Sequence, residues 1–389
     1  MIALKTAMLN HSLSPPPAQT TAKRLIHATG NELEELFEAA QQTRNHRTGK
    51  TITYSRKVFA PLTNLCRDRC AYCTFARPEN DPAARTMTLQ EVLAVAEAGR
   101  RAGCKEILLS LGDKPELLYP AHKAWLVAQG FDSTIEYLAA MCQLVFEETG
   151  LLPHSNPGVL TRAEIELLRP VNASMGMMLE STSDRLLAPG QAHYQCPDKV
   201  PAVRLRTLRD AGEAKVPFTT GILIGIGETL EERVDALFAI KELHDRYGHI
   251  QEVIIQNFRA KSGTLFAQRG EPDLLDLTRT AALARVIFGP EVSVQTPPNL
   301  SPGNFRALLA AGIDDWGGIS PVTLDFINPE RAWPKLALLR EATEAAGFEL
   351  RERLAVYPRY TTWIPSALRG GVSRLTDSEG LVRRDQELW

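Results

Sequence analysis

Three cysteines lie within eight residues of the chain, in the segment Asn64-Leu-Cys66-Arg-Asp-Arg-Cys70-Ala-Tyr-Cys73. Their Cys-x3-Cys-x2-Cys spacing is typical of an unusual iron-sulfur site. A four-iron cubane normally takes four cysteine ligands, so three thiolates leave one iron with an open coordination position. A small molecule can chelate an open iron, and the segment therefore predicts a site for chemistry.

A structural zinc site is the main alternative for these cysteines, but tetrahedral zinc requires a fourth Cys or His at a suitable distance. The other three cysteines, Cys104, Cys142 and Cys196, have no Cys-x2-Cys partner and no His three to five residues later. We therefore predict that each is a buried small side chain. A disulfide framework is disfavoured, because the cysteines are sparse and we identify no secretory signal before them.

The elements that must position these residues alternate short β-branched runs with longer helical patterns, which is typical of βα units and a parallel sheet. Four capping boxes, each a Thr or Ser followed three residues later by Glu, mark predicted helix starts at Thr88, Ser133, Thr161 and Thr229. We predict eight strands, of which the last is the most weakly marked: 57–62, 106–111, 151–154, 173–179, 218–224, 252–256, 292–295 and 315–317.

An open doubly wound sheet would show the same alternation, so the position of the polar segments decides between the two folds. A polar segment follows every predicted strand. In a TIM barrel the loops after the strands converge on one rim, whereas an open sheet offers a single crevice. We therefore predict an α/β fold, a (βα)8 TIM-type barrel in residues 51–332. Residues 1–50 are predicted as a tail and leading helix, and residues 333–389 as an extension, helical to Gly347 and irregular afterwards.

The cysteine triplet on such a barrel resembles that of the radical S-adenosylmethionine (SAM) enzymes. This resemblance implies a [4Fe-4S] cluster held by Cys66, Cys70 and Cys73. It also implies that SAM binds the open iron through its amino and carboxylate groups and is cleaved reductively to a 5'-deoxyadenosyl radical. The electron would come from a reductase or a flavodoxin-like donor.

Other segments resemble the SAM-binding elements of that family. Tyr72 matches an aromatic position that lies against adenine, although an aromatic side chain there would also shield a cluster. The run Ser110-Leu-Gly112-Asp113 occupies the place of a Gly-Gly-Glu element that meets the methionine amino group, and departs from it at three positions. Glu180 is expected to accept hydrogen bonds from the ribose hydroxyls, with a capping or ion-pair role as the alternative.

The run from Gly221 to Glu228 resembles the Gly-x-Ile-x-Gly-x-x-Glu element of the fifth strand. Within it, Gly225 and Gly227 are expected to let the backbone approach adenine closely. Their spacing does not match the Gly-x-Gly-x-x-Gly fingerprint of dinucleotide-binding folds. Lys199 or Arg204 is expected to pair with the methionine carboxylate, unless both are solvated helix charges.

Longer strings resemble, more narrowly, the cyclase subunits of 7,8-didemethyl-8-hydroxy-5-deazariboflavin (FO) synthases. They include Pro61-Leu-Thr-Asn-Leu-Cys66, His154-Ser-Asn-Pro-Gly158, Gln256-Asn-Phe-Arg-Ala-Lys261 and Asp314-Asp-Trp-Gly-Gly-Ile-Ser-Pro321. This resemblance implies that a partner radical enzyme joins a tyrosine-derived p-hydroxybenzyl group to 5-amino-6-ribitylaminouracil. This chain would close the third ring of the adduct with loss of ammonia, as a carbon-nitrogen lyase. The coupling partner itself, a menaquinone-pathway cyclase, and a non-catalytic zinc or iron-sulfur protein are the alternatives.

Such a substrate carries hydroxyl and carbonyl groups, and each one left unpaired in a buried site costs about 1 to 3 kcal/mol. Several predicted rim residues are suitable partners, although each is also a candidate brace of the barrel. These candidates are Lys114, His154, Asn156, Gln256, Asn257, Arg259, Thr296 and Asn299. No residue is assigned a proton-transfer role.

The composition favours a small-molecule enzyme. A net charge of -2 with both signs interspersed gives no footprint for nucleic acid or an anionic membrane. No apolar run approaches the ~20 residues of a membrane helix, and residues 1–24 lack the apolar region of a signal peptide. We therefore expect a cytoplasmic protein. Residues 11–23 resemble a weak transit peptide, but three consecutive prolines favour a disordered tail.

Overall fold

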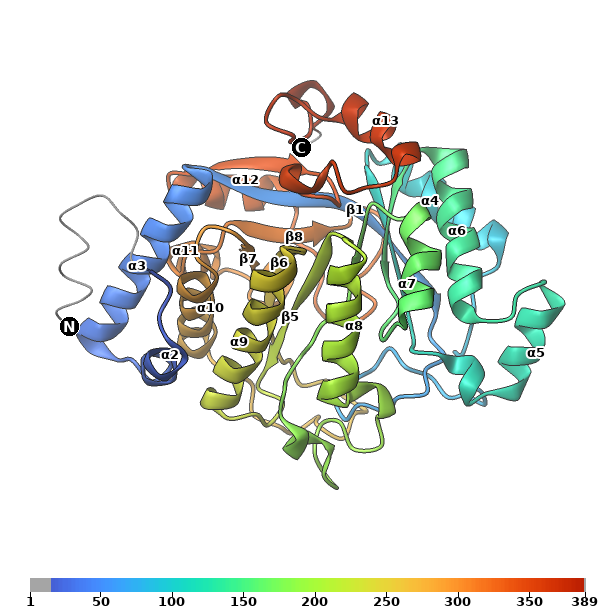
Figure 1. Ribbon diagram of the computed structural model, residues 1–389, viewed down its shortest axis with the longest axis horizontal. Coiled ribbons are helices and arrows are strands. Elements are labelled where there is room, and N and C mark those ends of the chain that lie inside the picture. Colours follow the sequence, from blue (N-terminus) through green and yellow to red (C-terminus); the bar gives the residue numbers. More distant parts are fainter. Residues whose placement is uncertain (1–14, 388–389) are drawn as a thin grey trace.

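Eight parallel strands form a closed barrel in the structure, a computed structural model that describes residues 15–387. Each strand pairs with the next, and β1 pairs with both β2 and β8, which closes the circle (Figure 1). The (βα)8 prediction is therefore confirmed. The strands are β1 (Thr51–Thr63), β2 (Glu106–Leu111), β3 (Leu152–Asn156), β4 (Ser174–Gly176), β5 (Phe218–Ile224), β6 (Ile250–Asn257), β7 (Ser293–Gln295) and β8 (Asp315–Ile319).

Helices pack around the barrel, and α7, α8 and α9 cover the strands in the view of Figure 1. Thr88, Thr161 and Thr229 form the predicted capping boxes. Ser133 accepts the predicted hydrogen bond from the N–H of Glu136, but the Glu136 carboxylate accepts from the N–H of Asp132 instead. The helices are α3 (Gly30–Thr48), α4 (Leu89–Arg101), α5 (Pro120–Ala128), α6 (Thr134–Thr149), α7 (Arg162–Leu168), α8 (Pro201–Glu213), α9 (Leu230–Tyr247), α10 (Leu274–Phe288) and α11 (Phe305–Ala310).

The first strand and the C-terminal extension differ from the prediction. β1 begins at Thr51 rather than at residue 57. After α12 (Leu336–Ala345), a ninth strand, β9 (Glu349–Arg353), pairs in parallel with the first half of β1, and α13 (Ser366–Leu375) follows. The expectation of irregular structure after residue 347 was wrong, because the charged sequence of β9 hides a buried strand. Its Arg353 forms ion pairs with Asp315 at 2.6 Å and with Glu252 at 3.1 Å.

The N-terminal segment is helical sooner than expected. α2 (Gln19–Leu25) begins inside the stretch 11–23 that was predicted to be disordered, and it buries Ala22 and Leu25. Residues 1–14 lie outside the described part of the chain. No helix in residues 15–387 is long and apolar enough to cross a membrane.

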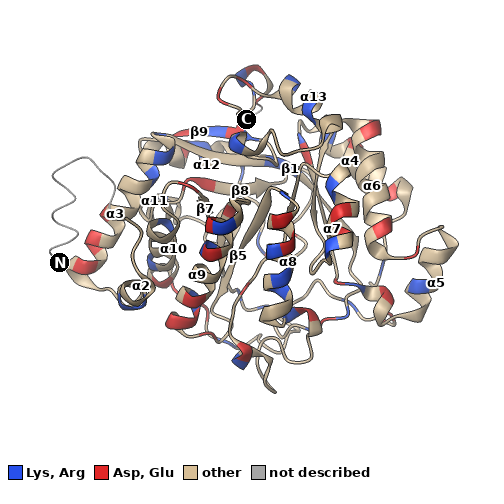
Figure 2. Ribbon diagram, viewed as in Figure 1, with Lys and Arg blue, Asp and Glu red and all other residues tan. Residues whose placement is uncertain are grey.

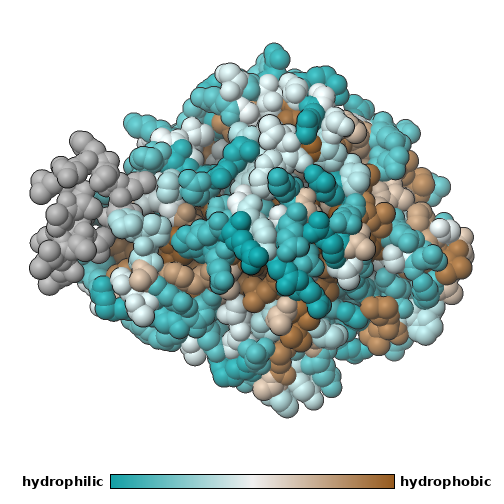
Figure 3. All heavy atoms as spheres, in the orientation of Figure 1, coloured by the Kyte–Doolittle hydropathy of each residue, from teal (hydrophilic) through white to brown (hydrophobic). Residues whose placement is uncertain are grey.

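The surface of the molecule carries charges of both signs, and both signs are present on each of α7, α8 and α9 (Figure 2). The face seen in Figure 3 is largely hydrophilic, with an apolar area over α5. Leu117, Leu118 and Val127, in and just before α5, are exposed. No large surface of a single sign marks these helices for an acidic or basic polymer.

Alternate residues of the strands point into the barrel, as the two-residue period of a strand requires. On β2 and β3, Leu108 pairs with His154, and Ser110 pairs with Asn156. One level lower on β2, Glu106 pairs with Lys57 of β1. The interior is therefore charged near the start of the strands and carries amide and hydroxyl groups near their C-terminal ends.

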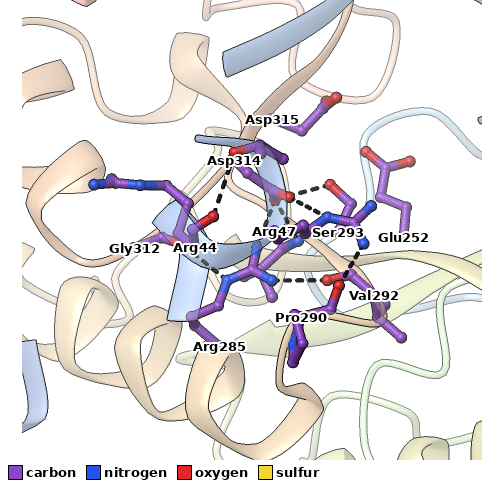
Figure 4. Close-up of polar contacts among 12 residues, drawn as sticks. Arg44, Arg47, Glu252, Arg285, Pro290, Val292, Ser293, Gly312, Asp314 and Asp315 are labelled. Atoms are coloured by element: carbon purple, nitrogen blue, oxygen red, sulfur yellow. Dashed lines mark hydrogen bonds and ion pairs between the residues drawn. The ribbon is translucent and has the colours of Figure 1, made fainter. Parts of the chain in front are cut away.

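A buried carboxylate, that of Asp314, ties two outer helices to the barrel (Figure 4). It accepts hydrogen bonds from Arg285 of α10 at 2.5 Å and from Arg47 of α3 at 2.6 Å. The hydroxyl of Ser293 and the N–H of Val294, both on β7, donate to it at 2.9 Å. Burial acts to raise the pKa of Asp314, but the two guanidinium groups hold it below its ordinary value.

Candidate active site

The three cysteines of the triplet line one cavity of about 240 Å³ beyond the C-terminal ends of the strands. We call it the outer cavity. The N–H of Asp113 donates to the Sγ of Cys66 at 3.2 Å, and the hydroxyl of Tyr119 donates to the Cys66 carbonyl at 3.1 Å. A Cβ at Gly112 would lie 1.9 Å from the carbonyl oxygen of Leu65. Glycine at 112 thus allows the loop after β2 to support the cysteine loop directly.

A fourth cysteine lies beside the triplet. The Sγ of Cys196 is 3.8 Å from the Sγ of Cys70, and Cys196 is buried. The prediction that Cys196 is a buried side chain is confirmed, but its place next to Cys70 was not foreseen, because a loop after β4 brings it back to the cysteine segment. Cys104 and Cys142 are buried within the apolar core, as predicted. Within residues 15–387 no His lines the outer cavity, so its donor set is made of thiols and carboxylates.

The donor set suits a cluster bound by thiolates. Burial raises the pKa of the Cys66 and Cys73 thiols in the metal-free chain. Because a metal binds the thiolate form, loading a cluster here would release protons. Three thiols in one cavity with open space beside them fit a cluster that is held on one side only.

Glu180 organises the wall of the outer cavity next to Cys70. Its carboxylate accepts hydrogen bonds from Lys199 at 2.7 Å, from the hydroxyl of Tyr72 at 2.5 Å and from His193 at 3.0 Å. Its backbone is in the left-handed region, with φ of 67°, a strained conformation for a residue with a side chain. Burial acts to raise the pKa of Glu180, but Lys199 and His193 bring it well below the ordinary value. The carboxylate is therefore ionised, and three protein donors leave it about one of its four acceptor positions.

Lys199 and Arg204, the two cations expected to pair with the methionine carboxylate, both form hydrogen bonds with other protein groups. Arg204 donates to the carbonyls of Met178 at 2.9 Å and Asp198 at 3.0 Å, and Lys199 is paired with Glu180. Both line the outer cavity, and neither is a solvated helix charge. Asp198 also pairs with Arg67 of the cysteine loop.

The end of β2 and the loop after it bring Ser110 and Asp113, respectively, to the outer cavity. One oxygen of Asp113 accepts from the N–H of Val159 at 2.9 Å, and the other has no hydrogen-bond partner among the described residues. Burial raises the pKa of Asp113 to about 8, and the carboxylate of Asp198 acts in the same direction. The space around this carboxyl group therefore favours its protonated form at neutral pH.

Gly225 and Gly227 do not line the outer cavity in the structure. The N–H groups of both glycines donate to the carboxylate of Glu228, at 2.7 and 3.0 Å. The space where a Cβ would stand is filled by Pro272 at Gly225 and by Arg269 at Gly227. Positive φ angles of 93° and 117° explain why both positions are glycine. The two residues form a turn, and their contact with adenine stays a prediction.

A second cavity, of about 190 Å³, lies deeper in the barrel. We call it the inner cavity. It shares Ser110, Asn156 and Gln256 with the outer cavity, so the two meet at the upper polar layer of the barrel. The loop after β8 and the C-terminal segment also contribute to its wall, through Trp333 and Arg353.

The eight expected substrate contacts are divided between the two cavities and the rest of the fold. His154 and Asn299 line the inner cavity, and Asn257 and Arg259 the outer one. Asn156 and Gln256 line both. Lys114 lines neither, because it is paired with Glu164, and Thr296 is fully buried outside both.

Comparison with known proteins decides the family. Residues 60–240 match the Radical SAM superfamily. The chain is 50% identical over 334 residues to 7,8-didemethyl-8-hydroxy-5-deazariboflavin synthase of Methanopyrus kandleri, a match that covers 85% of this chain and 100% of that protein. The chain belongs to this family of radical SAM proteins. Membership of the superfamily implies an iron-sulfur cluster and SAM.

This radical SAM chain also resembles longer proteins. It is 51% identical over 377 residues to the FO synthase of Nocardia farcinica, covering 93% of this chain but 44% of that protein. The chain thus spans less than half the length of the FO synthases that it matches.

Solved structures share the fold of this radical SAM chain. The FeFe-hydrogenase maturase HydG from Carboxydothermus hydrogenoformans has a TM-score of 0.72 at 19% identity, covering 95% of this chain and 87% of that one. Methylornithine synthase (PylB) has a TM-score of 0.67 at 17% identity, covering 90% and 97%. At these identities the likeness is one of fold.

Several residues of the radical SAM site escaped the sequence analysis. His193 and Cys196 lie in an irregular loop after β4, where no periodic pattern marks them. Lys57 and Glu106 line the inner cavity, and the sequence pattern of their strands could have identified them. Each is a charged residue at an inward position of a strand that is otherwise mostly apolar.

The hydrogen bonds of His154 fix its tautomer. The hydroxyl of Ser174 donates to the carbonyl of Ala355 at 2.7 Å, so the Nδ1 of His154, 2.6 Å from that oxygen, must be the donor to it. Its Nε2 is then an unprotonated acceptor. Burial lowers the pKa of His154 to about 3.

We therefore predict that His154 stays neutral, with the proton on Nδ1, from pH 8 down to pH 5. Nitrogen-15 NMR of labelled imidazole groups measures both properties. Below its ordinary pKa of 6.5, the unfolded chain binds a proton that the folded chain does not. As the pH decreases below 6.5, the free energy of unfolding therefore decreases by about 1.4 kcal/mol per pH unit on account of His154. A proton on Nε2, or titration near pH 6.5, would contradict this assignment.

Proposed function

We propose that the chain is a radical SAM cyclase, a carbon-nitrogen lyase that converts the p-hydroxybenzyl adduct of 5-amino-6-ribitylaminouracil into FO with loss of ammonia. The observation that carries the proposal is the match over the whole length of the Methanopyrus kandleri 7,8-didemethyl-8-hydroxy-5-deazariboflavin synthase at 50% identity. A cavity lined by three cysteines that opens onto a polar inner cavity supports it.

Cys66, Cys70 and Cys73 would hold a [4Fe-4S] cluster in the outer cavity. When bound there, the cluster and SAM supply a 5'-deoxyadenosyl radical after reduction by a one-electron donor. Tyr72 lies beside this space and is held by Glu180, which is itself held by Lys199. These residues position the cofactor, since a buried and ionised hub with several partners is rigid.

The substrate would occupy the inner cavity, with its reacting part beside Ser110, Asn156 and Gln256, where the two cavities meet. The barrel wall at this level keeps reacting groups close together and excludes water, which would quench a primary radical. The task of these residues is orientation, because the cofactor supplies the difficult chemistry.

A second protein is expected to perform the coupling step. The FO synthases are more than twice as long as the region that this chain matches in them, since it covers 44% of the Nocardia farcinica protein. We infer that the coupling activity resides in the remainder of those proteins, and that this chain works with a radical SAM partner of the corresponding activity.

An anaerobic incubation with the adduct, SAM and a reductant tests the proposal. We expect both 5'-deoxyadenosine and the blue fluorescence of FO. Deoxyadenosine formed only with tyrosine and 5-amino-6-ribitylaminouracil would indicate the coupling partner instead. Binding of one zinc ion, with no iron or sulfide after anaerobic reconstitution, would refute the radical assignment altogether.

A further inference from the structure

The inner cavity is lined by the partly buried amino group of Lys57, which has no described carboxylate within ion-pair distance. The ammonium of Lys57 has no hydrogen bond or ion pair with any residue in 15–387, and its Nζ lies 5.4 Å from the ring centre of Trp333 and 5.8 Å from that of Phe59. The side chain runs across Gly318, where a Cβ would stand 2.4 Å from its Cδ and 2.7 Å from its Nζ. The absence of a side chain at 318 therefore lets Lys57 reach the cavity.

Three acceptors around the same cavity have no donor. They are one carboxylate oxygen of Glu106 and the side-chain carbonyls of Gln295 and Asn299, and each residue is at most 5% exposed. The side chain of Gln295, like that of Lys57, passes over a glycine. A Cβ at Gly317 would lie 2.3 Å from the Nε2 of Gln295. A buried polar atom without a partner is costly and rare in a folded protein, so a cluster of them in one cavity indicates a polar ligand.

Lys57, Glu106 and Gln295 form a continuous arc on neighbouring strands, and Asn299 lies in the short helical turn just after β7. Glu106 lies on β2, Lys57 on β1 and Gln295 on β7, and the two glycines lie on β8 between the last two. Lys57 and Glu106 face each other in the register of β1 and β2, at the lower level of the barrel and away from the cysteine loop that follows β1. The part of a ligand that reaches this level is therefore remote from the outer cavity, where the radical would form.

We propose that this arc binds a linear polyol, the ribityl chain of the substrate, with Lys57 donating to hydroxyl oxygens and Glu106, Gln295 and Asn299 accepting from hydroxyl groups. The inference rests on the proposed function. A chain of hydroxyls offers a donor and an acceptor at every carbon, which matches one free donor and three free acceptors spread over neighbouring strands. A phenol offers one hydroxyl, and a pyrimidinedione offers its carbonyl and N–H groups around one rigid plane rather than along a flexible chain.

The chemistry of the reaction favours the same orientation. The phenol and pyrimidinedione rings both become part of the fused three-ring product, so both must lie near the reacting atoms. The ribityl chain is the only large pendant group. It can fill the lower level while the rings remain at Ser110, Asn156 and Gln256.

The test compares two fluorescent ligands on the reconstituted holoenzyme: FO, and an analogue with a methyl group in place of the ribityl chain. We expect the wild-type protein to bind FO at least tenfold more tightly, as measured by fluorescence titration. K57M should lose most of that preference while binding the methyl analogue like the wild type. G318A, whose Cβ displaces Lys57 without changing its charge, should behave in the same way.

The matched control is K241M, which removes an ammonium paired with Asp245 on the surface of α9. It should retain the wild-type preference, and thermal melts establish that each variant is folded. Equal weakening of both ligands in K57M would place Lys57 against the rings and overturn the proposal, as would an unchanged preference. If the wild type neither binds FO nor converts the adduct, the proposed function fails as well.

Discussion

Cys70→Ala prevents the chain from retaining four irons and abolishes formation of 5'-deoxyadenosine, whereas Cys196→Ala leaves both intact: this is the expected result for a cluster with three protein ligands. The two sulfur atoms are only 3.8 Å apart. Comparing the two variants therefore distinguishes a cysteine that binds the cluster from one that only lies next to it. A cubane held by three cysteines has an open iron for SAM, and one held by four has none.

Iron and sulfide analysis after anaerobic reconstitution, with chromatography for deoxyadenosine, measures the difference. Cys142→Ala is a further control, since that thiol lies in the apolar core beside Ser155 and away from the outer cavity. Loss of iron from Cys196→Ala, with retention by Cys70→Ala, would mean that the ligand set is wrong. Loss from both would indicate a closed site with four cysteines.

Asp314→Ala is expected to reduce the free energy of unfolding by about 3 to 5 kcal/mol, the cost of leaving a buried charge without its partner. The guanidinium of Arg285 is fully buried and would lose its only carboxylate partner among the described residues. Arg47, Ser293 and Val294 would lose an acceptor as well. Urea unfolding followed by tryptophan fluorescence measures the change.

Asp245→Ala provides the comparison, because its ion pair with Lys241 is exposed and should be worth less than about 1 kcal/mol. The pH dependence gives a second check. The pKa of Asp314 in the folded state lies below its unfolded value of 3.8, so its stabilisation is present above pH 3.8 and disappears as the pH falls through the folded value. Equal stability of the two variants at pH 7 would show that the Asp314 network is not a major anchor of the barrel.

The parts of the fold that local sequence determines were predictable. Capping boxes at Thr88, Thr161 and Thr229 mark helix starts because the cap is formed within four residues. The barrel was predictable because a polar segment follows each predicted strand in the sequence. β9 was not predictable from its charged sequence, because its burial depends on Asp315 and Glu252, far away in the chain.

The candidate site was predictable where residues are close in sequence, as in the cysteine triplet. It was not predictable where distant segments meet. The approach of Cys196 to Cys70 depends on a loop with no pattern, and the position of Lys57 depends on the absence of a side chain at Gly318. At Gly225 and Gly227 the recognisable motif forms a turn closed by Glu228, a feature that the sequence analysis did not include.

The ninth strand sets a limit on how this protein can be recombined with its relatives. Arg353 neutralises Glu252 and Asp315 inside the barrel, and it lies next to the floor of the inner cavity together with Ala355. In a chimera with its crossover at the end of β8, Glu252 and Asp315 would come from one parent and Arg353 from the other. Crossover points placed beyond Val356 keep the charge balance of the interior within a single parent.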